Sequence, residues 1–457
     1  MSVSDSGDAK LRVAIIGSGP AGSYAAGHLL RHTDSELHVD LYERLPTPWG
    51  LVRAGVAPDH PKIKSVTNLY ERTAEHPRLR LFANVEFGRH VTLDDLRRHY
   101  NAIVYAVGTP TDRAMGIPGE DLAGSYAATD FVGWYNGHPD FRDREFDLSG
   151  ERVVVVGAGN VALDVARMLV LARDELAVTD IADHALDVLA GSGVREVLVV
   201  ARRGPAQAAF TNPELRELGE LSDADVVVDA YELALGDVHD DPNADPTALR
   251  NVEILRDYST RPLVGHRRRV ALRFLLSPLE LNGTARVESV TLARNALEPS
   301  ADGSLRARAT DERLEIPAQA VFRAIGYRGT PLAGVPFDSE RELIANVDGR
   351  VRRGEYVVGW AKRGPSGVIG TNKKDANETV DALLEDLAAG RLLNPEPIGD
   401  EALERFVRER QPELVDYGDW LEIDRHERGL GEPAGRPRVK LTTVAQMLEA
   451  IGWGGDD

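Results

Sequence analysis

With 457 residues, 42% of them hydrophobic and 28% charged, the chain has the composition of a globular protein long enough for two or three domains. Its formal net charge of −19 argues against non-specific binding to nucleic acid or to a membrane. It contains no cysteine, which excludes disulfides, iron–sulfur clusters, thiolate metal sites and a catalytic thiol. We therefore expect no metal site and no redox-active cysteine pair.

The N-terminus carries no recognisable targeting signal. Residues Met1 to Lys10 are polar and acidic, and they lack the basic start, apolar stretch and cleavage site of a signal peptide. No apolar run approaches the ~18 residues that a transmembrane helix needs. We therefore expect a short N-terminal tail and a cytoplasmic protein.

The first periodic segment predicts a strand–helix–strand unit, with a strand at Leu11–Ile16, a helix at Ala21–His32 and a second strand at Leu37–Tyr42. The loop after the first strand reads Gly17-Ser18-Gly19-Pro20-Ala21-Gly22, a complete G-x-G-x-x-G. In this motif Gly17 permits the tight turn, Gly19 leaves room for a pyrophosphate, and Gly22 lets helix and strand pack closely. Glu43 follows the second strand, where a carboxylate accepts hydrogen bonds from a ribose. The unit predicts a site for an adenosine without a 2′-phosphate.

A second unit of the same kind begins about 140 residues later. We expect a strand at Val153–Val156, helices at Val161–Ala172 and Asp180–Ala190, and a strand at Glu196–Val200. Its loop reads Gly157-Ala158-Gly159-Asn160-Val161-Ala162, with alanine in the third position, a permitted variant.

The second strand of this unit is followed by two arginines, Arg202 and Arg203, rather than a carboxylate. A guanidinium pair at this point accepts a 2′-phosphate through charge-assisted hydrogen bonds and so favours NADPH over NADH. The alternative is a pair of arginines at a solvated strand end.

The two units predict an α/β fold with two Rossmann-like dinucleotide-binding domains, the second inserted in the first. Apolar strands at Ala102–Val107 and Gln319–Ile325 both break at glycine, and we place the domain crossings near residues 112 and 326. The expected domains are therefore 10–112 with 327–457, and 113–326. We further expect an antiparallel meander within Asn251–Leu297, an acidic surface excursion at Ser222–Thr247, and a helical, polar stretch over the last ~75 residues.

A third glycine-rich segment spans Glu355 to Lys374. We expect a strand ending at Gly359-Trp360, a turn through Gly367-Val368-Ile369-Gly370, and a helix from about Asp375. Backbone amides at such a helix start can face the electron-rich edge of a flavin and stabilise the negative charge that reduction develops there. Trp360 could lie along the ring; the alternative is a tight loop with an exposed tryptophan.

Taken together, these motifs resemble the adrenodoxin-reductase-type ferredoxin–NADP reductases, FAD enzymes with two dinucleotide-binding domains. The resemblance covers almost the whole chain, looks closest to the actinobacterial members, and is carried by the segments GSGPAG at 17–22, PTPWGLVRAGVAPDHPKIK at 46–64, DFVGWYN at 130–136, GAGNVALDVAR at 157–167, RRGPAQAAFTNPELREL at 202–218 and GWAKRGPSGVIGTNKKDA at 359–376.

The resemblance implies binding residues for each cofactor. FAD contacts would fall on the first loop (Gly17, Gly19, Ala21, Gly22) and on Glu43, Leu51, Val85, Trp360, Gly367, Val368 and Ile369. NADP contacts would fall on Gly159, Asn160, Val161, Ala162, Arg202, Arg203, Glu214 and Gly367. His60 and Glu214 match the family's two polar residues near the flavin and nicotinamide, where they would orient groups rather than donate protons.

The function expected from this resemblance is FAD-dependent NADPH:ferredoxin oxidoreductase activity. The partner would be a small acidic iron–sulfur ferredoxin, and the protein would be a monomer. Basic residues near the family's flavin-side loops (Lys62, Lys64, Arg72, Arg78, Arg80) and beside the third segment (Lys362, Arg363, Lys373, Lys374) would steer this partner; the alternative is that they are scattered surface charges. The alternatives are an NADPH-dependent flavin monooxygenase or diaphorase, an electron-channelling subunit of a larger complex, and a non-catalytic cofactor sensor.

Overall fold

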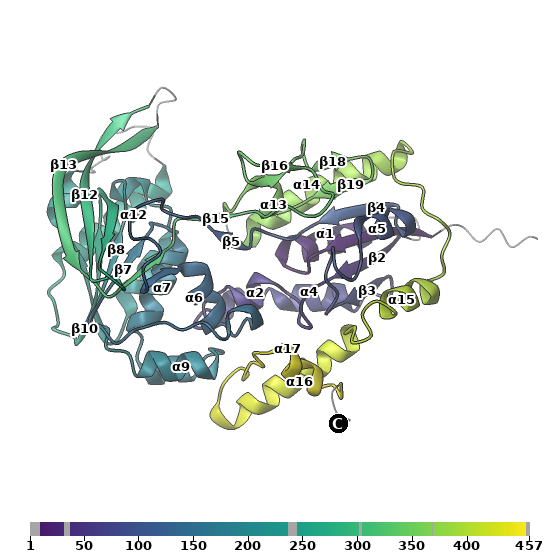
Figure 1. The fold of residues 1–457 in the computed structure, drawn as a ribbon, viewed down its shortest axis with the longest axis horizontal. Coiled ribbons are helices and arrows are strands. Elements are labelled where there is room, and N and C mark those ends of the chain that lie inside the picture. The colour runs from purple at the N-terminus through teal and green to yellow at the C-terminus, as the bar shows by residue number, and fades with distance from the viewer. Residues whose placement is uncertain (1–9, 32–36, 236–244, 301–303, 368, 454–457) are drawn as a thin grey trace, which may run out of the picture. The chain divides into compact units, whose positions relative to one another are not determined.

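The structure is a computed structural model that describes residues 10–31, 37–235, 245–300, 304–367 and 369–453 (Figure 1). The chain divides into two compact units. The first comprises the chain up to Thr111 and from Tyr327 onward, and the second comprises Asp112–Gly326. The two segments that join them, β5 (Thr111–Asp112) and β15 (Tyr327–Arg328), pair as a two-stranded sheet.

The first unit is built on a six-stranded sheet with the order β18-β19-β4-β1-β2-β3. All neighbouring pairs are parallel except β18 and β19. The strands are β1 (Leu11–Ile16), β2 (Leu37–Tyr42), β3 (Leu79–Phe82), β4 (Ala102–Tyr105), β18 (Arg350–Arg352) and β19 (Glu355–Val357), and a separate hairpin pairs β16 (Phe337–Asp338) with β17 (Leu343–Ile344).

Both faces of this sheet are buried, because successive side chains of a strand point to opposite faces. Val13 and Ile15 of β1 belong to the apolar cluster that includes α1 residues, whereas Ala14 and Ile16 belong to a different cluster. The helices of the unit are α1 (Pro20–Arg31), α2 (Leu51–Ala54), α3 (Pro61–Lys64), α4 (Thr67–Ala74), α5 (Leu93–His99), α13 (Trp360–Arg363), α14 (Ile369–Ala388), α15 (Asp400–Arg408), α16 (Tyr417–Gly431) and α17 (Val444–Glu449), with a 3-10 turn η4 (Glu432–Ala434).

The second unit repeats this design. Its six-stranded sheet has the order β6-β14-β7-β8-β10-β9, and every neighbouring pair is parallel. Val153 and Val155 of β7 face one apolar cluster, and Val154 and Val156 face another. The strands are β6 (Ser125–Ala127), β7 (Arg152–Val156), β8 (Glu196–Val200), β9 (Ala224–Val228), β10 (Arg268–Arg273) and β14 (Ala320–Arg323).

A second, antiparallel sheet of this unit contains β11 (Leu276–Asn282), β12 (Ser289–Pro299) and β13 (Leu305–Pro317). The helices are α6 (Ala128–Tyr135), α7 (Asn160–Val170), α8 (Arg173–Ala177), α9 (Asp183–Ala190), α10 (Asn212–Glu217), α11 (Ala230–Leu235) and α12 (Pro246–Thr260), with 3-10 turns η1 (Pro139–Phe141), η2 (Pro205–Gln207) and η3 (Leu218–Glu220). The predicted fold class is confirmed: both units carry a mostly or wholly parallel sheet in which one strand, β1 or β7, leads into a glycine loop and a helix.

The meander predicted within Asn251–Leu297 is partly wrong. Its first part is the end of helix α12, and β10 is a parallel strand between β8 and β9. Only β11 to β13 form an antiparallel meander. The alternation of Val270 and Leu272 indicates a strand, but it carries no information on the direction of the neighbouring strands.

Two further local predictions are wrong. The segment Ser222–Thr247 was expected to be a surface excursion, but Ala224–Val228 is the edge strand β9 and helix α11 follows it; residues 236–244 lie outside the described chain. The helix expected from about Asp375 begins at Ile369. Glycine, threonine and asparagine at residues 370–372 are weak helix formers, so the sequence of the first turn of α14 resembles that of a loop.

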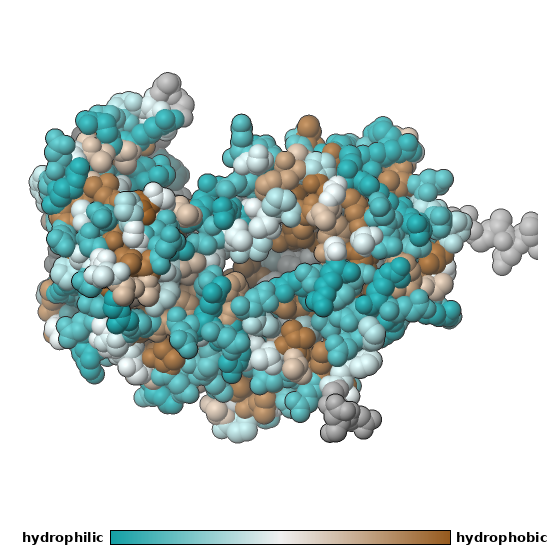
Figure 2. All heavy atoms as spheres, in the orientation of Figure 1, coloured by the Kyte–Doolittle hydropathy of each residue, from teal (hydrophilic) through white to brown (hydrophobic). Residues whose placement is uncertain are grey.

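The surface in Figure 2 is mostly hydrophilic, with hydrophobic residues in small separate groups. Among the helices in the described ranges, none combines the length and apolar character needed to span a bilayer.

Candidate dinucleotide-binding sites

The loop between β1 and α1 requires glycine at two of its three motif positions for reasons internal to the protein. Gly17 has φ of +106°, and a Cβ there would lie 2.5 Å from the carbonyl oxygen of Ala106. A Cβ on Gly22 would lie 2.0 Å from the carbonyl oxygen of Gly17. Gly19 differs, because the nearest atom to its Cβ would be the Cα of Gly50 at 3.9 Å, an ordinary contact. The chain's own packing therefore does not require glycine at 19, which fits close approach of a pyrophosphate to the backbone.

Glu43 is tied to this loop. Its Oε2 accepts hydrogen bonds from the hydroxyl (2.6 Å) and the backbone N–H (3.2 Å) of Ser18, and its Oε1 accepts one from Leu45 N–H (3.1 Å). A carboxylate has about four acceptor positions, so one position remains for a ligand hydroxyl. The sequence placed Glu43 at the right strand end, but it did not anticipate the role of Ser18, whose side chain is fully buried.

The segment after β2 folds over the glycine loop. Trp49 has φ of +82°, a backbone conformation uncommon for a residue of this size. Its backbone N–H donates a hydrogen bond to Ser18 Oγ at 3.2 Å. Gly50 has φ of +49°, and a Cβ there would lie 2.9 Å from the Cα of Gly19. Leu51 then opens α2 and is 40% exposed.

Val85 is also placed near this loop by backbone hydrogen bonding. It is buried, and its N–H donates to the carbonyl oxygen of Glu43 at 2.8 Å. The predicted FAD residues Glu43, Leu51 and Val85 therefore all lie on backbone that contacts the first glycine loop or the strand end beside it.

The third glycine-rich segment contacts the start of α1. Gly359 has φ of +72°, and a Cβ there would lie 2.6 Å from the Cβ of Ala21. The buried carboxylate of Asp375 accepts the Gly359 N–H at 2.5 Å and pairs with Lys362 Nζ at 3.0 Å. Trp360, the next residue, therefore begins a short helix beside the glycine loop rather than standing in an exposed loop.

The other predicted residues of this segment surround the start of α14. Gly367 has φ of +79°, and Ile369 is the first residue of the helix. Val368 lies outside the described residues.

Several buried polar side-chain atoms of the first unit have no hydrogen-bond partner among the described residues, and they include the indole Nε1 of Trp49, the indole Nε1 of Trp360 and the hydroxyl of Thr109. Buried polar groups are normally satisfied, so such atoms call for an explanation, and a bound ligand is one. Thr109 follows β4 in the crossing Gly108-Thr109-Pro110 and was not predicted as a site residue. Its sequence signal was only a glycine break after an apolar strand. The open Gly19, the remaining acceptor position on Glu43 and these unsatisfied atoms fit a dinucleotide with a polar ring system.

The first two glycines of the second unit's loop resemble Gly17 and Gly19 in conformation and surroundings. Gly157 has φ of +150°, and a Cβ there would lie 2.2 Å from the carbonyl oxygen of Ala324, the counterpart of Ala106. Gly159 has open space around its Cβ position and ordinary extended backbone. Asn160, Val161 and Ala162 form the first turn of α7, and the side chain of Asn160 accepts a hydrogen bond from Thr211 N–H at 2.9 Å.

Arg202 and Arg203 follow β8 on well-anchored backbone. The carbonyl of Arg202 accepts from the Asn295 side chain at 2.7 Å, and the carbonyl of Arg203 accepts from Leu275 N–H at 3.1 Å. Arg202 is exposed and Arg203 is half-buried. Within the parts of the chain that the structure describes, neither guanidinium makes a hydrogen bond or an ion pair. The pair therefore remains available for an anionic ligand.

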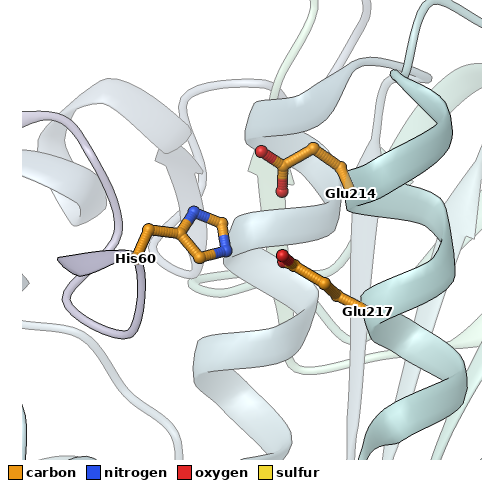
Figure 3. A group of neighbouring side chains, drawn as sticks. All are labelled: His60, Glu214 and Glu217. Atoms are coloured by element: carbon orange, nitrogen blue, oxygen red, sulfur yellow. The ribbon is translucent and has the colours of Figure 1, made fainter. Parts of the chain in front are cut away.

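Glu214 lies on α10 together with Glu217, and Figure 3 shows both side chains projecting from the same side of that helix. Arg167 of α7 carries the opposite charge, with Nη1 at 3.7 Å from Glu214 Oε2 and 3.6 Å from Glu217 Oε2. Glu214 and Arg167 are buried, so this ion pair places a buried positive charge beside the Glu214 carboxylate. The sequence did not single out Arg167.

His60, also drawn in Figure 3, belongs to the first unit. It is the N-cap residue of α3, is 8% exposed, and is followed by Pro61 at the first helical position. The proline fixes the helix start and with it the backbone of His60.

Two parallel-sheet units, each with a glycine loop opening a helix and each with a different charge after its second strand, define a pyridine-nucleotide oxidoreductase with two dinucleotide-binding folds. Residues 11–203 match the family model described as pyridine nucleotide-disulphide oxidoreductase. The disulfide in that description has no counterpart here, because the chain contains no cysteine.

The similarity to individual proteins extends over nearly the whole chain. The chain is 52% identical to the NADPH-ferredoxin reductase FprA of Mycobacterium leprae over 97% of this chain and 98% of the relative. It is 41% identical to the mitochondrial NADPH:adrenodoxin oxidoreductase of Salvelinus fontinalis over 96% of this chain and 90% of the relative. The solved structure of Mycobacterium tuberculosis FprA in complex with NADPH superposes with a TM-score of 0.94 at 50% identity, covering 97% and 99% of the two chains. The chain belongs to the NADPH-ferredoxin reductase family, which confirms the predicted resemblance.

Proposed function

We propose that this chain is an FAD-dependent NADPH:ferredoxin oxidoreductase in which the first unit holds FAD and the second holds NADPH. The observation that carries the assignment is the difference in charge between equivalent strand ends. Glu43 follows β2 and has one acceptor position free, whereas Arg202 and Arg203 follow β8 and their guanidinium groups have no partner among the described residues. A carboxylate suits a ribose hydroxyl, and a guanidinium pair suits a 2′-phosphate.

In the first unit, Gly19 and the N-terminus of α1 would receive the pyrophosphate, and Glu43 would accept from the ribose. Leu51, Val85, Trp360 and the segment from Gly367 to Ile369 would line the flavin. FAD, when bound, supplies the hydride-accepting and single-electron-donating chemistry that no amino acid of this chain can provide. Without cysteine, no thiol of the protein can relay the electrons.

In the second unit, Gly159 and the first turn of α7, which contains Asn160, Val161 and Ala162, would receive the pyrophosphate of NADPH. Arg202 and Arg203 would bind its 2′-phosphate. Gly367 would contribute from the third segment, as the family resemblance implies.

Glu214 and His60 are proposed as orienting residues. Glu214 lies 3.7 Å from Arg167, and a carboxylate is a hydrogen-bond acceptor only, which suits the NH₂ group of the nicotinamide amide. The proline-fixed backbone at His60 suits a side chain with a defined direction. Neither residue needs to transfer a proton for a hydride transfer to proceed.

The proposed partner is a small acidic iron–sulfur ferredoxin, and the chain is proposed to act as a monomer. Two of the basic residues expected from sequence to attract this partner form ion pairs within the protein instead. Arg80 is committed to the buried Asp40 through two hydrogen bonds of 2.8 and 2.7 Å, and Lys362 is committed to Asp375. The exposed members of the set are Lys62, Arg72, Lys373 and Lys374, and these would steer an acidic carrier.

The test is anaerobic stopped-flow reduction of the purified protein by NADPH and by NADH, followed by addition of a ferredoxin. We expect rapid loss of flavin absorbance with NADPH, much slower loss with NADH, and rapid reoxidation by ferredoxin. Reduction without reoxidation by ferredoxin, but with oxygen consumption in the presence of an organic substrate, would favour a monooxygenase. Failure of NADPH to reduce the flavin would refute the proposal.

A further inference from the structure

The C-terminal part of the first unit contains a carboxylate with no exposure to solvent. Glu427 of α16 has an exposed fraction of 0%. Its two oxygens accept hydrogen bonds from both terminal nitrogens of Arg53, at 2.5 and 2.9 Å, from Arg438 at 3.1 Å and from the backbone N–H of Leu441 at 2.8 Å. Burial by itself raises the pKa of Glu427, but the charges of Arg53 and Arg438 hold it below its usual range. Glu427 is therefore a fully satisfied buried anion.

Arg53 links the Glu427 carboxylate to helix α2. It lies in the single turn of α2, and its guanidinium carbon stands 5.4 Å from the centre of the Trp420 ring. Lys440 adds a further link, because its Nζ donates to the carbonyl oxygen of Arg53 at 3.1 Å. The side chain and the backbone of Arg53 are thus both held by residues from the C-terminal forty positions of the chain.

The turn that α2 continues is the one that lies on the first glycine loop. Trp49 and Gly50 immediately precede α2, and both have positive φ. The close approach of Gly50 to Gly19 and the hydrogen bond from Trp49 N–H to Ser18 Oγ join this turn to the loop backbone. A turn with such dihedral angles persists only where the surrounding structure over-determines it. A helix of four residues cannot hold it by its own hydrogen bonds.

We propose that Glu427 is a positioning residue for the FAD site: by binding Arg53 it holds α2, and through α2 it holds the Trp49–Gly50 turn against the glycine loop that receives the pyrophosphate. This inference rests on the proposed function for the identity of the ligand. It assigns to helix α16, near the C-terminus, a role in cofactor affinity, although no residue of α16 belongs to the predicted site.

The test compares two buried glutamates of the same unit. Glu427→Gln removes the charge that holds Arg53 and keeps the side-chain volume. Glu355→Gln is the matched control, because Glu355 is 1% exposed and is bound by Arg97, Arg352 and Tyr105. It stands at the first residue of β19, paired with the start of β4, and therefore at the opposite end of the parallel strands from the glycine loop.

Full-length apoprotein of each variant is titrated with FAD by quenching of flavin fluorescence, and the thermal midpoint of each apoprotein is recorded separately. Visible circular dichroism of the reconstituted holoprotein reports the flavin environment. If removal of the anion leaves the turn in its binding conformation about a tenth of the time, the dissociation constant of FAD rises about tenfold. We expect this rise and an altered dichroism spectrum for Glu427→Gln. For Glu355→Gln we expect a lower thermal midpoint with an FAD affinity within about twofold of wild type.

An unchanged FAD affinity for Glu427→Gln, or an equal loss in both variants, would overturn the inference. If Glu427→Gln does not fold, Arg53→Lys decides. It keeps the positive charge but loses the two-pronged contact, and we expect it to weaken FAD binding severalfold; an affinity equal to wild type would overturn the inference. A wild-type protein that binds no FAD would instead refute the proposed function, so the two failures are distinguishable.

Discussion

Replacing both arginines after β8 by alanine, R202A/R203A, is expected to remove most of the discrimination between NADPH and NADH. The substitution acts on side chains alone. The backbone carbonyls of these residues stay anchored by the Asn295 side chain and by Leu275 N–H. Because neither guanidinium has a partner in the described chain, removing the two groups breaks no hydrogen bond or ion pair among the described residues.

The magnitude follows from the exposure of the two side chains. A hydrogen bond to a charged group contributes about 1.5–3 kcal/mol. Arg202 is exposed and Arg203 is half-buried, so solvent and salt screening place each contribution near the lower end, about tenfold in affinity per arginine. The double variant should therefore lose about a hundredfold in kcat/KM for NADPH and change little for NADH.

The assay is steady-state reduction of ferricyanide with each nucleotide at low and at high ionic strength. R267A is the matched control. Arg267 is an exposed arginine of the same unit that likewise has no partner in the described chain, and it stands just before β10, at the end of the parallel strands away from the glycine loop. Its loss should leave the NADPH/NADH ratio unchanged.

Equal losses with NADPH and NADH would refute the reasoning, because they would indicate damage to the unit rather than loss of a 2′-phosphate contact. A comparable fall in the ratio for R267A would also refute it, since the effect would then come from overall charge.

Two further outcomes follow from local geometry and charge. Gly17→Ala should prevent stable folding of the first unit, because its Cβ would lie 2.5 Å from the Ala106 carbonyl at φ of +106°, whereas Gly19→Ala should keep the thermal midpoint of the apoprotein and lose FAD affinity; a similar loss of stability in both variants would contradict this. The pKa of Asp386 is lowered to about 2, against the opposing effect of burial, by Arg350 and its other hydrogen-bond partners. A lowered folded-state pKa means that the carboxylate stabilises the protein above the ordinary aspartate range and that this contribution disappears as the pH falls from about 4 to about 2. The thermal midpoint of Asp386→Asn should therefore lie below that of wild type at pH 7 and converge with it near pH 2, as differential scanning calorimetry can measure; a constant gap across this range would exclude the ionised Asp386 as the cause.

The strand–loop–helix units were predictable because their signals are local. The strands at Leu11–Ile16, Leu37–Tyr42 and Glu196–Val200 have the bounds expected from the sequence. A buried parallel strand is a continuous apolar run, and a glycine with positive φ, Gly17 or Gly157, follows the strand that leads into each dinucleotide loop. The residues that make these features are neighbours in the chain.

The predicted site residues of the first unit come from four separate stretches of sequence. Motifs identified the stretches, and the structure brings Glu43 to Ser18, Gly50 to Gly19 and Gly359 to Ala21. The unsatisfied hydroxyl of Thr109 could not be recognised from sequence, because a threonine after a glycine has no distinctive pattern and its burial depends on residues far along the chain.

The structure explains part of a basic cluster at His266 to Arg269. Arg268 donates to the carbonyls of Val170 and Leu171 at the end of α7, where a positive charge complements the helix dipole. Arg269 pairs with Glu196 of β8. These partners lie more than seventy residues away in the chain, so the local sequence pattern could not predict the contacts.

The sequence by itself determined the family, the two dinucleotide loops and the opposite charges after β2 and β8, because each is a property of a short stretch whose chemistry does not depend on distant residues. Only the tertiary structure decided that β10 joins a parallel sheet, that residues 222–235 contain a strand and a helix, and that Glu427 binds Arg53. These features depend on which surfaces meet when the chain closes, and pairings across hundreds of residues leave no trace in local pattern.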